Sequence, residues 1–113
     1  AHYTTNIYRT FGAYTARAFG ADYRSISKGG SGVAGGFQPY TLLDFYDRWN
    51  FDGYTPANAQ PWDFARWTPD VVVIGIGHND QFGNNADWVP RYQTLVTNLR
   101  AKYPAAHIFC VNT

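Results

Sequence analysis

The sequence of 113 residues contains no glutamate, no methionine and only one cysteine, and charged residues make up just 15% of it. Without glutamate, aspartate is the only carboxylate side chain available for acid–base chemistry. A single cysteine excludes an internal disulfide and a cysteine-based zinc cluster. Nine Lys and Arg residues balance eight Asp to a net charge of +1 and are scattered along the chain. Because nonspecific nucleic-acid binding requires a dense basic face, no nucleic-acid partner is expected.

Long apolar runs are missing as well. No apolar stretch approaches the ~20 residues that a membrane span requires, and no signal peptide opens the chain, so no membrane partner is expected. Processing of a secreted precursor would also leave a chain of this kind. The lone Cys110 lies in the apolar run Ile108–Val111 and is predicted to be a buried structural thiol, with a reactive thiol as the alternative.

The residues that are present favour a folded protein. Hydrophobic residues make up 45% and aromatic residues 19% of the chain, and its length suits a single domain with a real core. Helical spacing predicts three helices and apolar runs predict three strands, alternating along the chain. The helices are expected at residues 5–19, 41–49 and 88–103, and the strands at 22–27, 71–76 and 108–111.

The run from Val71 to Ile76 is the strongest strand prediction. It does not alternate with polar residues, as expected for a parallel strand covered on both faces. Gly20 is expected to end the first helix, and Trp49 to point inward from the second. Asp87 is predicted to cap the third helix, which Pro104 ends. This alternation predicts an α/β domain with a layered sheet and right-handed crossovers.

Two unusual loops follow predicted strands, so both are expected on the rim where ligand sites of α/β sheets lie. The first, residues 27–36, contains five glycines. Gly30, Gly32 and Gly35 have the spacing of a dinucleotide-binding fingerprint, but no helix begins inside the loop and no strand ending in an acid follows about 20 residues later. The glycines are better explained as letting a backbone N–H approach a reacting oxygen, with a plain flexible loop as the alternative.

The second loop, residues 75–81, contains Asn79, whose amide can donate a hydrogen bond, between His78 and Asp80. An Asn-Asp pair after a strand is also a common turn. His78 is a candidate for ligand contact, with loop packing as the alternative. Of the other histidines, His2 is expected to be exposed to solvent and His107 to have a structural role.

Together the two loops resemble conserved blocks of the Ser-Gly-Asn-His hydrolases, also called GDSL-like esterases and lipases. Residues 71–80, which end in Gly-x-Asn-Asp, resemble the third block of that family, and residues 25–32 resemble the second. Four more segments run in the order typical of the carbohydrate acetyl esterases of this superfamily whose catalytic domain follows a jelly-roll module. These are residues 14–23, 42–49, 62–70 and 92–107.

The resemblance implies a three-layer α/β sandwich with a flavodoxin-like parallel sheet. It also implies a secreted serine esterase that deacetylates polysaccharide or a similar glycan without a metal or organic cofactor. Two oxyanion donors carry over: the N–H of Gly30, with Gly32 as the alternative alignment, and the amide of Asn79. The residues proposed to bind substrate are Gly32, His78 and Trp62. Aromatic residues that border the connection 50–61 are candidates for stacking on sugar rings, with a place in the hydrophobic core as the alternative. These are Tyr40, Trp49, Tyr54, Trp62 and Trp67.

Two catalytic blocks of that family are missing from this sequence. It contains neither the Asp-Ser dipeptide of the nucleophile nor the Asp-x-x-His of the base. Residues 1–113 are therefore expected to be part of a catalytic domain, with the first and last strands of its sheet missing. The family's strand order, 2-1-3-4-5, places the first strand between 22–27 and 71–76, so these two strands should not pair directly. The remainder of the domain or another chain would complete the sheet. The alternative is a non-catalytic glycan-binding or self-assembling structural subunit.

Overall fold

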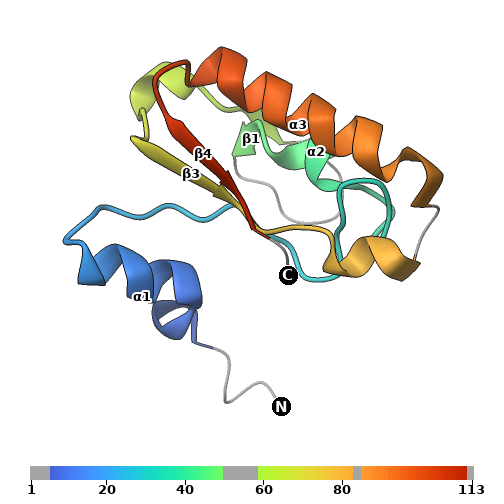
Figure 1. Ribbon diagram of the computed structural model, residues 1–113, viewed down its shortest axis with the longest axis horizontal. Coiled ribbons are helices and arrows are strands. Elements are labelled where there is room, and N and C mark those ends of the chain that lie inside the picture. Colours follow the sequence, from blue (N-terminus) through green and yellow to red (C-terminus); the bar gives the residue numbers. More distant parts are fainter. Residues whose placement is uncertain (1–5, 50–58, 83–84, 112–113) are drawn as a thin grey trace.

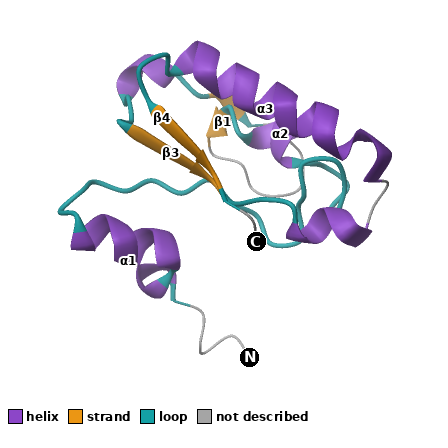
Figure 2. Cartoon of the chain, viewed as in Figure 1, coloured by secondary structure: helices purple, strands orange, loops and turns teal. Residues whose placement is uncertain are grey.

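The computed structural model describes residues 6–49, 59–82 and 85–111, which form an α/β fold (Figures 1 and 2). The helices are α1 (Phe11–Ala18), α2 (Leu42–Phe45) and α3 (Trp88–Lys102), and the strands are β1 (Arg48–Trp49), β2 (Gln60–Pro61), β3 (Val71–Ile74) and β4 (His107–Cys110). Short 3-10 turns cover Ile7–Arg9, Phe64–Arg66, His78–Phe82 and Asn85–Asp87. None of the helices in these described ranges is long and apolar enough to cross a membrane.

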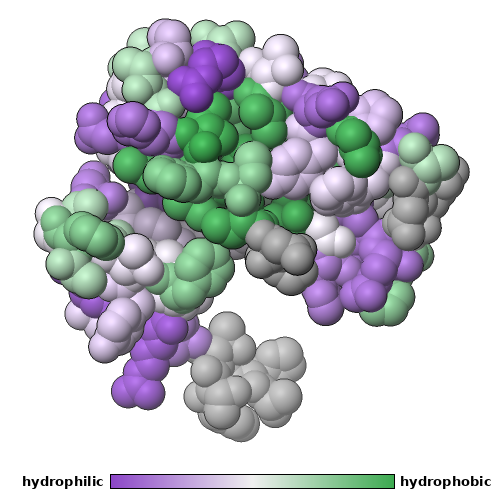
Figure 3. Space-filling view, in the orientation of Figure 1, coloured by the Kyte–Doolittle hydropathy of each residue, from purple (hydrophilic) through white to green (hydrophobic). Residues whose placement is uncertain are grey.

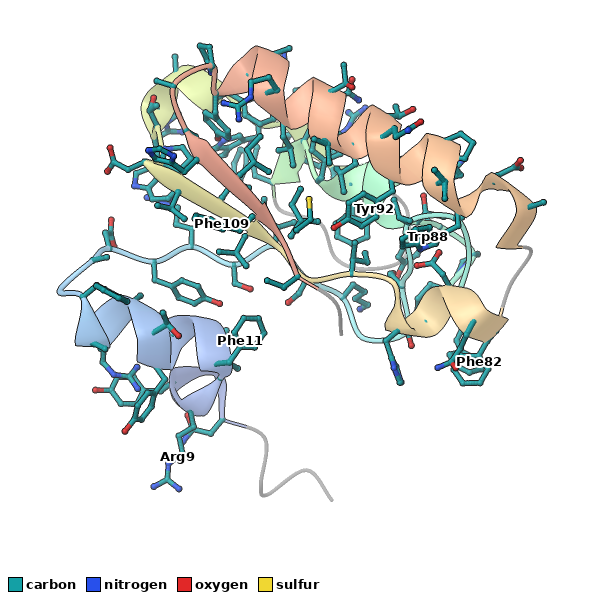
Figure 4. The ribbon with its side chains drawn as sticks, viewed as in Figure 1. Arg9, Phe11, Phe82, Trp88, Tyr92 and Phe109 are labelled. Carbon is teal, nitrogen blue, oxygen red and sulfur yellow. The ribbon has the colours of Figure 1, made fainter. Side chains whose placement is uncertain are left out.

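Strands β3 and β4 run parallel, and α3 connects them. The register pairs Val71 with His107 and Ile74 with Cys110. The predicted strand 71–76 therefore exists, but its ladder ends at Ile74. The prediction for the third helix is confirmed over Trp88–Lys102, because its apolar positions recur at helical spacing. Trp88 and Tyr92 extend from α3 toward the sheet in Figure 4.

The core lies between the sheet and the helices α2 and α3. Its buried centre consists of Val33, Tyr46, Ile74 and Leu95, with Val72, Ile76 and Ile108 packed against it. Val33 belongs to the glycine-rich loop and is 0% exposed. The loop is thus anchored in the core by its one large aliphatic side chain.

The opposite face of the sheet is uncovered within the described residues. Val71, Val73 and Phe109 are each about half exposed, at 50%, 51% and 55%. Figure 3 shows apolar side chains gathered over the middle of the molecule, and Figure 1 shows α1 on the side of the sheet away from α3. The apolar run predicted to be covered on both faces is covered here on one face.

Helix α1 ends as predicted, with Gly20 in the left-handed region at φ 62°. Its side chains do not form the buried face that its spacing predicts. Phe11 and Tyr14 are about 70% exposed, and Ala13 is the only buried residue of the helix. A carbon atom added at Gly12 would lie 2.5 Å from the hydroxyl of Tyr23, so the extended segment after α1 lies directly against the helix.

Two predictions of regular structure are wrong. Residues 22–27 form no strand, because a strand requires a partner for its backbone and none of the described residues pairs with this segment. No ladder joins it to β3, so the expected arrangement of two parallel strands with a gap between them is not present in the described residues. The helix predicted at 41–49 ends at Phe45, since Arg48 and Trp49 pair instead with Gln60 and Pro61. Trp49, predicted to point inward, is 50% exposed.

Two smaller predictions are wrong as well. Asp87 occupies the N-cap position of α3, but its side chain makes no capping hydrogen bond. The preceding 3-10 turn leaves its backbone at φ −99° and ψ 5°, outside the extended conformation that a capping residue normally adopts. The thiol of Cys110, predicted to be buried, is exposed, because Cys110 ends a strand whose neighbouring side chains are also largely uncovered.

Candidate active site at the carboxyl end of β3

The carboxylate of Asp80 joins the two loops that the sequence singled out. It accepts hydrogen bonds from three consecutive backbone N–H groups of the glycine-rich loop, those of Val33 (3.0 Å), Ala34 (2.6 Å) and Gly35 (3.0 Å). Asp80 is only 3% exposed. Three hydrogen bonds to one buried carboxylate compensate for removing its charge from water.

These three bonds also exclude the dinucleotide interpretation of the loop. A phosphate-binding loop leaves consecutive N–H groups free to surround an external anion. Here the N–H groups of Val33, Ala34 and Gly35 already surround the side chain of Asp80. The protein's own carboxylate occupies the position that a phosphate would need.

Asp80 reaches the loop because of the turn that follows β3. Gly77 adopts φ 138°, a conformation that favours glycine, and its carbonyl accepts a hydrogen bond from the N–H of Asp80 at 3.0 Å. The chain then enters the 3-10 turn His78–Phe82. Asn79 and Asp80 thus leave the sheet on a single tight turn.

At two positions of the loop, neighbouring atoms leave no room for a residue larger than glycine. A carbon atom added at Gly32 would lie 2.5 Å from the carboxyl atoms of Asp80. One added at Gly36, where φ is 121°, would collide with the carbonyl oxygen of Gly30 and lie 3.4 Å from the Cβ of Asn79. Gly30, Gly36 and Asn79 are therefore packed together at one point, which the sequence alone did not show.

The side chain of Asn79 is held in a defined direction. Its Nδ2 donates a hydrogen bond to the carbonyl oxygen of Ser31 at 3.1 Å. An amide nitrogen carries two hydrogens, so one N–H remains for a ligand. The hydroxyl of Ser31 is buried and has no hydrogen-bond partner among the described residues.

The structure distinguishes the two glycines considered as backbone donors. The N–H of Gly32 donates to the carbonyl of Gly35 at 2.8 Å and is therefore engaged. Within the described part of the chain, the N–H of Gly30 donates to no other residue, while its carbonyl accepts from Phe37 at 2.8 Å. Gly30, at φ 82°, is the better candidate for an oxyanion donor.

Arg91 of α3 holds the same loop from the other side. Its Nε donates to the carbonyl of Val33 at 2.9 Å, and its Nη2 donates to the hydroxyl of Thr41 at 3.0 Å. The loop is therefore fixed at Val33 from two elements, since the N–H of this residue is bound by Asp80 and its carbonyl by Arg91.

The other predicted site residues are less closely connected. His78 is exposed at the start of the turn, with its ring centroid 6.5 Å from that of Phe82. Phe82, at the outer end of this turn in Figure 4, contacts Phe37, which directly follows the glycine-rich loop, with the two ring centroids 4.8 Å apart. Trp62 lies instead beside Arg24, whose guanidinium is 5.8 Å from the centre of the Trp62 ring, and the backbone N–H of Trp62 donates to the carbonyl of Asp47.

The remaining aromatic candidates are distributed in the same mixed way. Tyr40 is buried, Trp67 is half-buried beside Arg24, and Trp49 is exposed. Tyr54 lies outside the described residues. Among the described residues, no group of three His, Cys or Asp side chains is arranged to hold a metal ion.

Two residues that shape the site, Asp80 and Arg91, have no predicted role in the sequence. Asp80 directly follows Asn79, and an acid with no helix to cap shortly after a buried strand is a signal for a contact with another loop. Arg91 lies three residues after Trp88 and four before Leu95, and so on the inward face of α3. A cation on the inward face of a helix needs a polar partner, so the position of Arg91 is itself a signal for a contact with a loop.

Comparison with known proteins finds relatives that match nearly the whole chain. The sequence profile of the GDSL-like lipase/acylhydrolase family matches residues 2–113. The chain is 36% identical over 112 residues to the cellulase/esterase CelE of Acetivibrio thermocellus, covering 93% of this chain and 13% of CelE. It is 31% identical to an acetylxylan esterase/glucomannan deacetylase of Cellvibrio japonicus, covering 97% of this chain and 34% of that protein.

A solved structure shows the same similarity in three dimensions. A family two carbohydrate esterase from Clostridium thermocellum, in complex with cellohexaose, superposes with a TM-score of 0.83 at 33% identity. The match covers 100% of this chain and 35% of that structure. The chain therefore spans about a third of the length of these relatives, or less.

Proposed function

Because this chain belongs to the GDSL-like lipase/acylhydrolase family, we propose that the complete protein removes acetyl groups from a carbohydrate and that residues 1–113 supply the oxyanion-stabilising loops of its active site. The observation that carries the proposal is the packing of Gly30 against Gly36 and of Gly36 against Asn79, at the carboxyl end of β3. Both donors that the sequence suggested belong to loops that contact each other directly.

In this proposal a serine oxygen from outside residues 1–113 attacks the acetyl carbonyl carbon while a base, also from outside, accepts the hydroxyl proton. The carbonyl π electrons move onto the oxygen, which becomes an oxyanion. The N–H of Gly30 and the free N–H of Asn79 donate to that oxygen. Collapse of the intermediate expels the sugar oxygen, which takes up the proton, and water later releases acetate. Each preorganised donor stabilises the transition state by roughly 3 to 4 kcal/mol.

The names of two relatives support the proposed substrate class. Both are named for deacetylating xylan or glucomannan. His78, Phe82 and Phe37 lie in or beside the two loops and are proposed to contact the carbohydrate, together with Trp62. Gly32 has no group left for the substrate, because it is buried and its N–H and carbonyl both bond within the protein. Acetylated polysaccharides lie outside cells, so the proposal includes secretion of the complete protein.

The uncovered face of the sheet supports the need for further chain. Val71, Val73 and Phe109 together present an apolar surface of a kind that soluble domains normally bury. We propose that the remainder of the domain covers this surface, pairs with the free edge of β3 and brings the nucleophile to the loops.

The test uses the complete protein encoded around these residues. Purified protein is expected to release acetate from acetylated xylan or glucomannan and to hydrolyse 4-nitrophenyl acetate, and a serine-directed inhibitor should abolish both activities. The 113-residue chain alone should show no activity above background. Binding of the polysaccharide without acetate release would contradict the proposal and favour a non-catalytic glycan-binding role. Inhibitor-sensitive turnover by the 113-residue chain would show that the nucleophile lies within it.

A further inference from the structure

One side chain binds three consecutive peptide groups of the glycine-rich loop. Residues 33–35 donate all three of their N–H groups to Asp80, and the Oδ1 atom alone accepts from both Ala34 and Gly35. From these contacts we propose that Asp80 is a positioning residue, which sets the orientation of the Gly30 N–H through the loop without touching the substrate. This inference rests on the esterase function proposed above.

The link from Asp80 to Gly30 passes through a short and rigid path. The N–H of Gly32 bonds to the carbonyl of Gly35, whose N–H is held by Asp80. Phe37 donates to the carbonyl of Gly30, and Ser31 bridges to Gly36. A shift of residues 33–35 therefore changes the peptide orientation at Gly30.

Asp80 also couples the two proposed donors. It directly follows Asn79 on the turn His78–Phe82, and Asn79 bonds to Ser31, the neighbour of Gly30. One turn thus carries a donor for the oxyanion and also the anchor for the loop of the other donor. The distance between the two donors is set by this turn rather than by the sheet.

The site requires a carboxylate of this length. An asparagine would place its NH₂ group against at least one backbone N–H, because the oxygen is the only acceptor atom of its side chain. A glutamate would need space for another methylene group, and the loop is so close to Asp80 that a carbon atom added at Gly32 would lie 2.5 Å from the carboxyl group. Neither substitution preserves all three bonds.

The experiment compares Asp80→Asn with Asp87→Asn in the complete protein. Asp87 is an exposed aspartate seven positions further along whose side chain makes no capping bond, so its variant should keep kcat within about twofold of the original. Asp80→Asn should lower kcat by about 100-fold and leave KM within about threefold, as expected when a donor is misplaced but substrate contacts remain. Asp80→Glu should not restore kcat.

Two further measurements do not depend on the Asp80 variant being active. Hydrogen exchange at the amides of Val33, Ala34 and Gly35 should be at least about tenfold faster in Asp80→Asn than in the original protein. Gly32→Ala, which forces the loop away from Asp80, should reproduce the loss of kcat. Combining it with Asp80→Asn should add little, because both changes break the same contact.

The outcomes separate this inference from the esterase proposal. A folded Asp80→Asn variant with kcat within about threefold of the original, or with unchanged amide exchange, would overturn the inference while leaving the esterase function intact. If the original protein releases no acetate, the esterase function fails, and amide exchange still decides whether Asp80 holds the loop. If Asp80→Asn does not fold, Gly32→Ala decides, because it forces the loop away from Asp80 while keeping the carboxylate. A folded Gly32→Ala variant with an unchanged kcat would overturn the inference.

Discussion

The side-chain nitrogen of Asn79 lies 3.1 Å from the carbonyl oxygen of Ser31, 48 positions earlier in the chain, and donates a hydrogen bond to it. This contact joins the turn after β3 to the glycine-rich loop. It also fixes which hydrogen of the amide is free, because a planar NH₂ group with one hydrogen engaged can present the other in only one direction. An amide that was free to rotate would have to be oriented each time a substrate bound.

Asn79→Ala should therefore reduce catalysis more than binding. In the complete protein we expect kcat to fall by about 100-fold or more, with KM within a few-fold of the original, as for loss of an oxyanion donor. Steady-state kinetics with 4-nitrophenyl acetate measure both constants. An unchanged kcat would reduce Asn79 to a residue that only shapes the turn.

Gly36→Ala should destabilise the complete protein by about 1 to 3 kcal/mol. Its φ of 121° is unfavourable for any side chain, and the added carbon would collide with the carbonyl of Gly30. Gly29→Ala is the matched control, because a carbon atom there would meet nothing within 4 Å. Denaturant unfolding should show a change of less than about 0.5 kcal/mol for the control. Equal effects of the two substitutions would contradict the packing described for Gly36.

The uncovered face of β3 gives a prediction about the complete domain. Val73 and Val89 are almost equally exposed in residues 1–113, at 51% and 53%. If further chain covers the sheet, Val73→Gln should cost the complete protein about 1 to 3 kcal/mol through an unsatisfied buried amide. Val89→Gln, on α3, should cost less than about 0.5 kcal/mol. Urea unfolding of both variants measures the difference, and similar small losses would show that the face stays in water.

Stability should decrease in alkaline solution through Tyr92. Burial raises the pKa of Tyr92 to about 12, and its hydrogen bond with Cys110 acts in the same direction. A folded-state pKa above the unfolded value of about 10 gives stability that is complete below pH 10 and lost as pH rises toward 12. The unfolding free energy of Tyr92→Phe should therefore decrease less steeply over this range than that of the original protein.

Urea unfolding at fixed pH values between 9 and 12 measures the slope. Burial also raises the pKa of Tyr46, so some alkaline loss should remain in the Tyr92→Phe variant. Parallel curves for the variant and the original protein would show that Tyr92 ionises equally easily in both states.

Patterns of neighbouring residues predicted the elements that are stabilised by their own sequence or by packing of an apolar face against the core. Helix α3 follows from its apolar spacing, and β3 and β4 from their apolar runs. The segment 22–27 has a strand-like composition but finds no pairing partner among the described residues, and no local pattern reports that. The end of α2 at Phe45 depends on pairing with Gln60, which is equally non-local.

The candidate site was predicted in part for the same reason. Gly30 and Asn79 could be named from the residue types that follow predicted strands. The role of Asp80 could not, since its partners lie 45 to 47 positions earlier and donate from the backbone, which every sequence provides. The fit between Gly32 and Asp80 is a matter of tenths of an ångström, which spacing along a sequence does not encode.

The separation of Asp80 from its partners has a consequence for the order in which the protein folds. The side-chain bonds to residues 31–35 of the glycine-rich loop come from Asn79, Asp80 and Arg91, 45 to 58 positions further along the chain. During synthesis, residues 31–36 leave the ribosome well before these side chains exist. Contacts of such high sequence separation form only after the intervening chain has closed its loop. We therefore expect the loop to become ordered late in folding, after β3 and the first turns of α3 are in place.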